Sequence, residues 1–135
     1  LRPLLKPQHT KALVLGTGGA SKAVIDGLQQ LGILTQYVSR TRREGIIAYD
    51  DITPEMLEEH KLVVNCTPLG MFPKVDDAPD IPYNSLGPEH LLYDLVYNPK
   101  ETLFLQKGRE QGATTKNGLE MLHLQAEASW NFWNK

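Results

Sequence analysis

A glycine-rich turn follows the first apolar run of the chain and has the spacing of a phosphate-binding loop. Gly16 stands where a buried strand is predicted to end, and it permits a tight turn. Gly18 lets the backbone approach a bulky anion, and the helix predicted to begin at Ser21 points its first amides and its dipole at that anion. A pyrophosphate fits these needs, although a plain glycine turn is the alternative. The residues of this candidate site are Gly16, Thr17, Gly18, Gly19, Ala20 and Ser21.

A basic turn follows the second predicted strand, about 20 residues after the glycines. At that position a carboxylate would hold the ribose hydroxyls of NAD, whereas arginine accommodates the 2′-phosphate of NADP. The chain has no carboxylate there, and guanidinium and hydroxyl groups can bind a phosphate through charge-assisted hydrogen bonds. The turn therefore predicts NADP, with an ordinary solvated basic turn as the alternative. The candidate residues are Ser39, Arg40, Thr41 and Arg43, with Arg42 beside them.

Other reactive side chains give no second kind of site. The single cysteine, Cys66, follows a predicted buried strand and has no histidine near it in sequence, so we interpret it as a small core or loop residue. The four histidines show no metal-ligand spacing, and we expect no metal site. No catalytic acid, base or nucleophile is assigned to this chain.

Short apolar runs alternate with helical patterns along the chain, which is typical of a parallel sheet with crossover helices. The predicted strands are Ala12–Leu15, Gln36–Val38, Leu62–Asn65, Leu91–Asp94 and Ala113–Thr115, with a further extended piece at Ile46–Tyr49. The predicted helices are Ser21–Leu31, Pro54–His60, Leu103–Gln111 and Gly118–Phe132. Proline-rich Thr67–Pro88 is predicted to be a long loop.

The composition is that of one globular domain. The chain has 135 residues, of which 41% are hydrophobic and 22% are charged. Its 14 basic and 16 acidic residues give no reason to expect a nucleic-acid partner. No apolar run approaches the ~20 residues that span a bilayer, and the first ten residues lack the pattern of a signal peptide. We expect no membrane association and a cytoplasmic location.

Five segments together resemble the C-terminal, NADP-binding domain of shikimate dehydrogenase. They are GTGGASKA at 16–23, SRT at 39–41, NCTPLGM at 65–71, DLVYNPKET at 94–102 and NGLEMLHLQA at 117–126. Each motif alone is modest, but five in this order are specific, and the resemblance covers nearly the whole chain. It implies an α/β, Rossmann-like three-layer fold with a mainly parallel, doubly wound sheet.

The resemblance also implies roles for residues outside the two turns. Thr67 would line the adenosine side of NADP, while Leu95 and Gly118 would offer backbone groups to the nicotinamide end. Met121 would pack near the nicotinamide ring. The residues that would contact shikimate are Tyr97 and Gln125, and Gln125 shares a helix face with Met121 because the two are four residues apart.

The family's acid and base residues lie in an N-terminal substrate domain, and no position of this chain matches them. The resemblance thus implies that residues 1–135 form the NADP-binding domain with its C-terminal helix, and that the substrate domain is absent. The parent enzyme would reversibly reduce 3-dehydroshikimate to shikimate with NADPH, in aromatic amino acid biosynthesis. We expect the chain alone to be inactive; its oligomeric state is not predicted.

Three departures from the family pattern keep other functions open. Ser39 replaces the usual asparagine, Glu44 occupies a position that is usually basic, and the stretch after Arg43 is short. A quinate/shikimate dehydrogenase with relaxed choice between NAD and NADP is one alternative. Glutamyl-tRNA reductase is another, although its last helix lacks the NGLxML and QA pattern. A non-catalytic NADP-binding module and a purely structural Rossmann domain remain as further alternatives.

Overall fold

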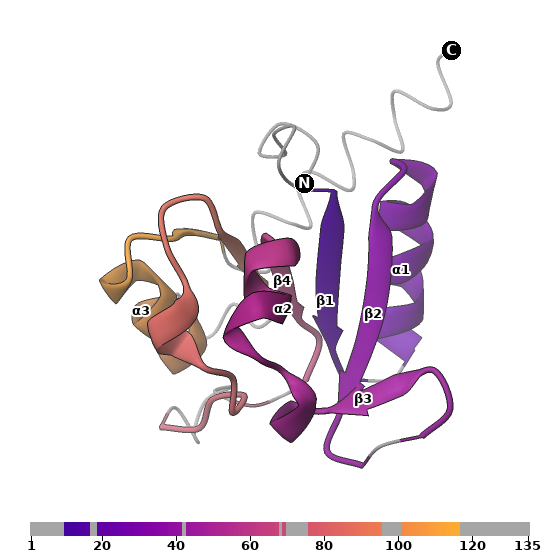
Figure 1. Cartoon of the computed structure of the whole chain (residues 1–135), viewed down its shortest axis with the longest axis horizontal. Coiled ribbons are helices and arrows are strands. Elements are labelled where there is room, and N and C mark those ends of the chain that lie inside the picture. The colour runs from indigo at the N-terminus through magenta and orange to yellow at the C-terminus, as the bar shows by residue number, and fades with distance from the viewer. Residues whose placement is uncertain are drawn as a thin grey trace.

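A computed structural model of the chain describes residues 10–16, 19–41, 43–67, 69, 76–95 and 101–116. These residues form a six-stranded sheet with the strand order β3-β2-β1-β4-β5-β6 (Figure 1). The strands are β1 (Lys11–Leu15), β2 (Leu34–Ser39), β3 (Ile46–Ala48), β4 (Leu62–Asn65), β5 (Leu91–Asp94) and β6 (Thr114–Lys116). All five pairings between these strands are parallel.

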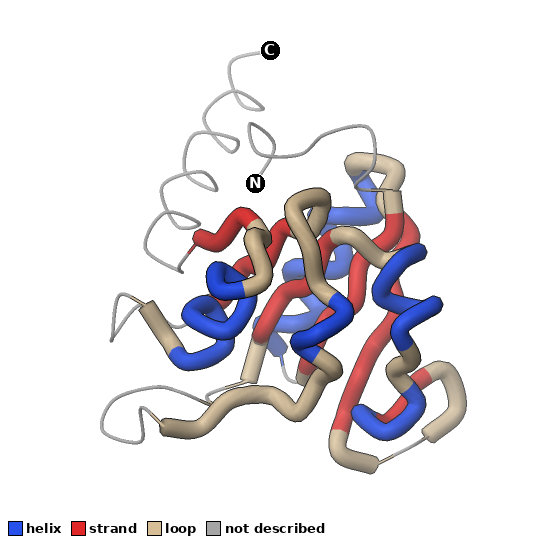
Figure 2. The backbone as a smooth tube through the Cα atoms, turned by 60° about the vertical axis from the view of Figure 1, so that its left-hand side comes forward, coloured by secondary structure: helices blue, strands red, loops and turns tan. Residues whose placement is uncertain are grey.

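Helices cover both faces of this sheet, as the blue segments on either side of the red strands in Figure 2 show. The helices are α1 (Gly19–Gln30), α2 (Pro54–Glu59) and α3 (Leu103–Glu110), with short 3₁₀ turns η2 (Tyr49–Asp51) and η3 (Tyr83–Ser85). In Figure 1, α1 lies to the right of β2, whereas α2 lies in front of β4. The arrangement confirms the predicted α/β, three-layer, doubly wound fold.

Alternation along the strands divides the core into two layers. In β1, Leu13 and Leu15 belong to one buried cluster, while Ala12 and Val14 belong to the other. Successive side chains of a strand point to opposite faces, so a strand buried on both sides must be apolar throughout. The first cluster includes Phe104 and Leu105 of α3, and the second includes residues of α1. This double burial explains why short continuous apolar runs marked the strands.

The predicted strands and helices are present wherever the structure describes them, and the extended piece at 46–49 forms β3. β2 begins at Leu34, two positions before the predicted start. The reason is pairing with β1 rather than burial: Leu34 is 66% exposed, but its N–H donates to the Thr10 carbonyl at 3.0 Å. β6 is shifted by one residue relative to the prediction. The predicted helix at 118–132 lies outside the described residues.

Helix α1 ends in a hydrogen-bonded turn that returns the chain toward β2. Gly32 has a φ of +79°, and its N–H donates to the Gln29 carbonyl at 3.0 Å. The Ile33 N–H donates to the Leu28 carbonyl at 3.0 Å, and both apolar side chains are buried in the same cluster. This bond pattern is a Schellman motif, in which a left-handed glycine stops a helix. It fixes the start of β2.

The connection from β2 to β3 is short, because residues 40–45 replace a crossover helix. Parallel neighbours usually need a dozen or more residues between them. Here β3 pairs only with the last three residues of β2, from Tyr37↔Ile46 to Ser39↔Ala48. The connection therefore has to run back along only this short part of β2 before β3 begins. The short stretch after Arg43 in the sequence therefore has its counterpart in the fold, a turn in place of a helix.

Candidate functional site

The carboxyl ends of β1, β2, β4 and β5 meet at one edge of the sheet. Register pairs Leu15 with both Val38 and Asn65, and pairs Asn65 with Asp94. The residues that follow these strand ends are therefore neighbours in space. Between β1 and β4 the strand order reverses direction, which is the position where open α/β sheets bind ligands.

Gly16 occupies this reversal point in a backbone conformation that only glycine adopts readily. Its φ is +101°, and its N–H donates to the Val38 carbonyl at 2.8 Å. A Cβ on Gly16 would lie 3.1 Å from Thr67 Cγ2 and 3.4 Å from the carbonyl carbon of Cys66. The turn after β1 thus contacts the segment after β4, with no room for a side chain between them.

Helix α1 begins at Gly19, directly beyond this turn. Ser21 is fully buried, and a small residue at this position allows helix and strand to approach closely. The first turn of α1 carries no acidic side chain. No acidic side chain in this turn therefore offsets the positive end of the helix dipole, and the free amides would favour a bound anion there. Thr17, Gly18 and the side chain of Ala20 lie outside the described residues.

The turn after β2 is held by two sets of hydrogen bonds. The backbone groups of Arg43 and Ile46 exchange N–H···O bonds of 3.0 and 2.9 Å, and Gln36 Nε2 donates to the Gly45 carbonyl at 3.1 Å. Arg40, Thr41 and Arg43 are exposed and Ser39 is half-buried, so their polar groups are accessible from solvent. A fixed backbone presents these side chains at the same edge of the sheet. Arg42 lies outside the described residues.

Tyr49 follows β3 at this edge, because Ser39 pairs with Ala48 in the register. Burial raises the pKa of the Tyr49 phenol, and the positive charge of Arg40 lowers it in part. Tyr49 also packs against the cluster below α2 and α3.

A network of buried polar side chains links the ends of β4 and β5, and our sequence analysis did not predict it. Asn65 Nδ2 donates to Asp94 Oδ1 at 3.2 Å, and the Thr102 hydroxyl donates to Asp94 Oδ2 at 2.6 Å. Asn65 Oδ1 accepts from the Thr67 hydroxyl at 2.6 Å and from its N–H at 3.0 Å. The signal in the sequence was a polar residue at the end of each of two apolar runs.

Cys66 lies between Gly16 and the polar network and is half-buried. Burial raises the pKa of its thiol to about 12, and the nearby Asp94 carboxylate adds to the increase. The thiol is therefore protonated at neutral pH and is a poor nucleophile. This environment supports the structural interpretation of Cys66.

Metal binding finds no support in the described part of the chain, where no group of three or more His, Cys, Asp or Glu side chains could hold an ion. His90 is buried and held by two backbone groups. Gly87 N–H donates to its Nδ1 at 3.1 Å, and its Nε2 lies 2.8 Å from the Leu57 carbonyl. Since Nδ1 accepts, Nε2 carries the proton, and the ring is neutral. Burial lowers the pKa of His90, opposed in part by the bond to Leu57.

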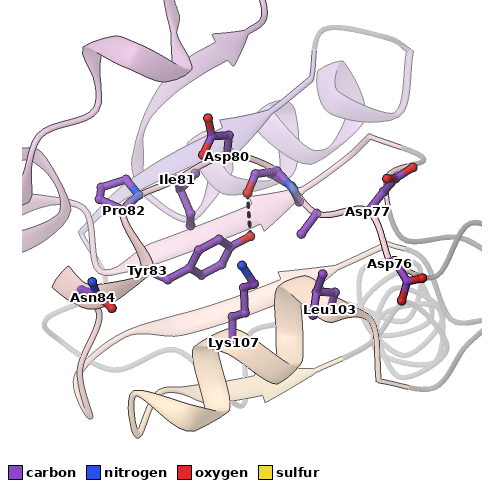
Figure 3. A pocket seen from close by; sticks show the side chains of 11 residues that line it. Asp76, Asp77, Asp80, Ile81, Pro82, Tyr83, Asn84, Leu103 and Lys107 are labelled. Atoms are coloured by element: carbon purple, nitrogen blue, oxygen red, sulfur yellow. Dashed lines mark hydrogen bonds between the residues drawn. The ribbon is translucent and has the colours of Figure 1, made fainter.

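A groove of about 570 Å³ lies apart from the predicted phosphate residues, between the segment that leads into η3 and helix α3 (Figure 3). Its lining includes the carboxylates of Asp76, Asp77 and Asp80. Tyr83 donates its hydroxyl to the Pro79 carbonyl at 2.6 Å, and Lys107 Nζ lies 4.9 Å from the centre of the Tyr83 ring. Three carboxylates against one ammonium disfavour a phosphate, so this groove is not the candidate anion site.

The structure brings together the described members of the predicted site at one edge. Gly16 and Thr67 follow β1 and β4 there, Ser39 ends β2, and Ser21 lies in the first turn of α1. Leu95 follows β5, and its N–H donates to the Asn65 carbonyl at 3.1 Å. The other predicted contact residues, Tyr97, Gly118, Met121 and Gln125, lie outside the described residues. Among the described helices, none is long and apolar enough to cross a membrane.

Strand order, layers and a glycine turn at the switch point define the class as a Rossmann-like α/β domain. No protein-family model matches the chain. The shikimate dehydrogenase (NADP(+)) of Desulforamulus reducens is 35% identical over an aligned length of 145 residues, gaps included. The alignment covers 94% of this chain and 50% of the relative. The protein of the same name from Clostridium beijerinckii is 39% identical over 131 residues, covering 92% of this chain and 48% of that relative.

Solved structures give the same result. Shikimate 5-dehydrogenase from Thermus thermophilus, in complex with NADP(H) and shikimate, matches with a TM-score of 0.73 and 31% identity, over 94% of this chain and 50% of that one. A chorismate mutase/shikimate 5-dehydrogenase fusion protein from Clostridium acetobutylicum matches with a TM-score of 0.70 and 37% identity, over 92% and 46%. Over nearly all of its length, the chain is thus similar to part of proteins named shikimate dehydrogenase. It spans about half the length of the curated relatives it matches.

Proposed function

We propose that this chain binds NADP at the carboxyl edge of its sheet, as the cofactor-binding part of a shikimate dehydrogenase. The observation that carries the proposal is the meeting of the Gly16 turn, the Arg40 turn and Thr67 at the switch point. Gly16 permits the tight turn that lies against Thr67, and the exposed guanidiniums supply the charge that a 2′-phosphate needs. The residues present therefore fit a dinucleotide phosphate.

Each segment has a separate task in this proposal. The turn from Gly16 to Ser21 and the start of α1 would hold the pyrophosphate, and Ser39, Arg40, Thr41 and Arg43 would hold the 2′-phosphate. Thr67 would line the adenosine side, and the Leu95 backbone would contact the nicotinamide end. For the residues outside the description, the family resemblance assigns Gly118 and Met121 to the nicotinamide and Tyr97 and Gln125 to shikimate.

The reaction of the whole protein would be hydride transfer between NADPH and the ketone of 3-dehydroshikimate. The cofactor supplies the hydride, and the protein fixes geometry and charge around it. This chain would provide the cofactor-binding site, and a second, substrate-binding domain would provide the proton-transferring residues. We propose that the chain alone does not catalyse the reaction and that the enzyme acts in the cytoplasm.

The test is a calorimetric titration of the chain with NADP⁺ and with NAD⁺, at low and at moderate salt. We expect preference for NADP⁺ that weakens as salt screens the exposed arginines. Arg40→Gln should weaken NADP⁺ binding about 10- to 100-fold and leave NAD⁺ binding unchanged, because only NADP⁺ carries the 2′-phosphate. Arg109→Gln is the matched control, since it removes an exposed guanidinium of α3, which pairs with Glu101 just before that helix. Equal loss of both cofactors in Arg40→Gln would contradict the assignment.

A quinate/shikimate dehydrogenase with relaxed cofactor choice is the second candidate. The observation that favours it is the exposed Glu44 in the turn after β2, next to Arg43. A carboxylate near the 2′-position repels a phosphate and can accept hydrogen bonds from ribose hydroxyls. Equal affinity for NAD⁺ and NADP⁺ would support this candidate, and Glu44→Gln should then restore preference for NADP⁺.

A further inference from the structure

Three members of the polar network at the ends of β4 and β5 are completely buried. Asn65, Asp94 and Thr102 each have 0% of their surface exposed. Buried polar groups destabilise a protein unless they are hydrogen-bonded, and apolar side chains of similar volume would fill the same space without that requirement. Both carboxylate oxygens of Asp94 accept hydrogen bonds from neighbouring side chains, at 3.2 and 2.6 Å. The network therefore specifies an arrangement of segments beyond what packing alone would fix.

The segments it fixes are those of the candidate cofactor site. Through its side-chain oxygen, Asn65 holds both the hydroxyl and the N–H of Thr67. Through its backbone oxygen, the same residue accepts the N–H of Leu95 at 3.1 Å. Thr67 stands on the adenosine side of the proposed site and Leu95 on the nicotinamide side. One asparagine thus ties the two sides together, and Asp94 holds the amide of that asparagine.

The other arm of the network reaches a helix. Thr102 is the N-cap of α3, and its hydroxyl accepts the Leu105 N–H at 3.3 Å while it donates to Asp94. Phe104 and Leu105 of that helix are buried in the core. Asp94 is therefore anchored to a packed element on one side and holds Asn65 on the other.

We propose that Asp94 is a positioning residue for the NADP site. By holding Asn65, it keeps Leu95 after β5 aligned with Thr67 after β4, and Thr102 holds Asp94 itself in place. The inference rests on the proposed function, because it concerns the two sides of the same NADP site. Asp94 itself does not touch the cofactor in this proposal. Its loss should weaken binding of a ligand that spans both sides more than binding of a ligand that occupies one.

The experiment compares NADP⁺ with 2′,5′-ADP, which carries the adenosine and its 2′-phosphate without the nicotinamide. Affinities of both are measured by calorimetry for the unaltered chain and for Asp94→Asn, which keeps the shape but replaces one acceptor by a donor. We expect NADP⁺ to bind about tenfold more weakly and 2′,5′-ADP to change less than about twofold, because loss of one buried hydrogen bond has that order of effect.

Two threonines provide a matched pair of variants. Thr102→Val removes the anchor of Asp94 together with a helix cap, and it should change the ratio of the two affinities as Asp94→Asn does. Thr53→Val removes the corresponding cap of α2, where Oγ1 accepts the Met56 N–H at 3.1 Å, without touching the network. It should leave the ratio unchanged. Thr102→Ser retains the hydroxyl and should restore the ratio.

The outcomes separate the inference from the function on which it rests. If the unaltered chain does not bind NADP⁺, both the proposed function and the inference are refuted. If it binds NADP⁺ but the ratio is the same in Asp94→Asn and Thr102→Val as in the unaltered chain, the inference alone is wrong. A change of ratio in Thr53→Val as large as in Thr102→Val would attribute the effect to general loosening and would also refute the inference.

Discussion

The conformation of Gly16 predicts a large loss of stability when a single methyl group is added there. In Gly16→Ala, a residue with a Cβ would have to keep a φ of +101°, which destabilises the folded state by about 1–2 kcal/mol. The same Cβ would lie 3.1 Å from Thr67 Cγ2, tighter than ordinary contact, and 3.4 Å from the backbone of Cys66. The reduced freedom of the unfolded chain offsets these effects by only about 0.4–1 kcal/mol. Overpacking of this kind adds about 1–3 kcal/mol, and we therefore expect a net destabilisation of about 2 kcal/mol.

Denaturant titration followed by far-ultraviolet circular dichroism measures this change. A loss of about 2 kcal/mol corresponds to a fall of roughly 8 °C in the melting temperature of a domain of this size. Gly27→Ala is the control, because Gly27 lies in α1 and, apart from its chain neighbours and the backbone of that helix, no described atom lies within 4 Å of the place that its Cβ would take. That variant should gain about 0.5–1 kcal/mol from helix propensity. Equal effects of the two substitutions, or a neutral Gly16→Ala, would refute the reasoning.

Three further predictions concern packing, pH and reactivity. Gly108→Ala should destabilise the fold by about 1–3 kcal/mol, because its Cβ would overlap Cδ2 of the buried Leu92, and adding Leu92→Val should recover part of the loss in denaturant titrations. The free energy of unfolding should fall as pH drops below about 6.5, because the unfolded chain binds a proton at His90 that the folded chain, with its lowered pKa, does not. His90→Gln should flatten that slope in stability measurements made across pH 5 to 7, and an unchanged slope would exclude His90 as its source. The Cys66 thiol should react with a disulfide reagent at pH 8 much more slowly in the folded than in the denatured chain, since its pKa is about 12; similar rates would show that the thiol is accessible and ionised.

Burial on both faces made the strands predictable from sequence. Val63 and Val64 point to opposite core layers, so β4 reads as an uninterrupted apolar run. The start of β2 was less predictable, because Leu34 joins the sheet through a backbone bond to Thr10 and not through burial. Local hydrophobicity predicts which segments are buried, whereas backbone pairing with the neighbouring strand determines at which residue a strand begins.

The candidate site was predictable to the extent that it depends on local conformation. Gly16 has the positive φ of the expected tight turn, and the basic turn after β2 carries its arginines on the surface. The Asn65–Asp94 bond joins residues 29 positions apart, and nothing near either residue in sequence indicates the other. Such long-range polar pairs become visible only when the strand register is known.

The outermost strands of the described sheet affect how this domain can associate. β3 and β6 contain three residues each, so each outer edge presents few backbone groups for pairing with another chain. Short edge strands are one way in which β-sheet proteins avoid growing by strand addition. Lateral β-aggregation through these two strands is therefore disfavoured.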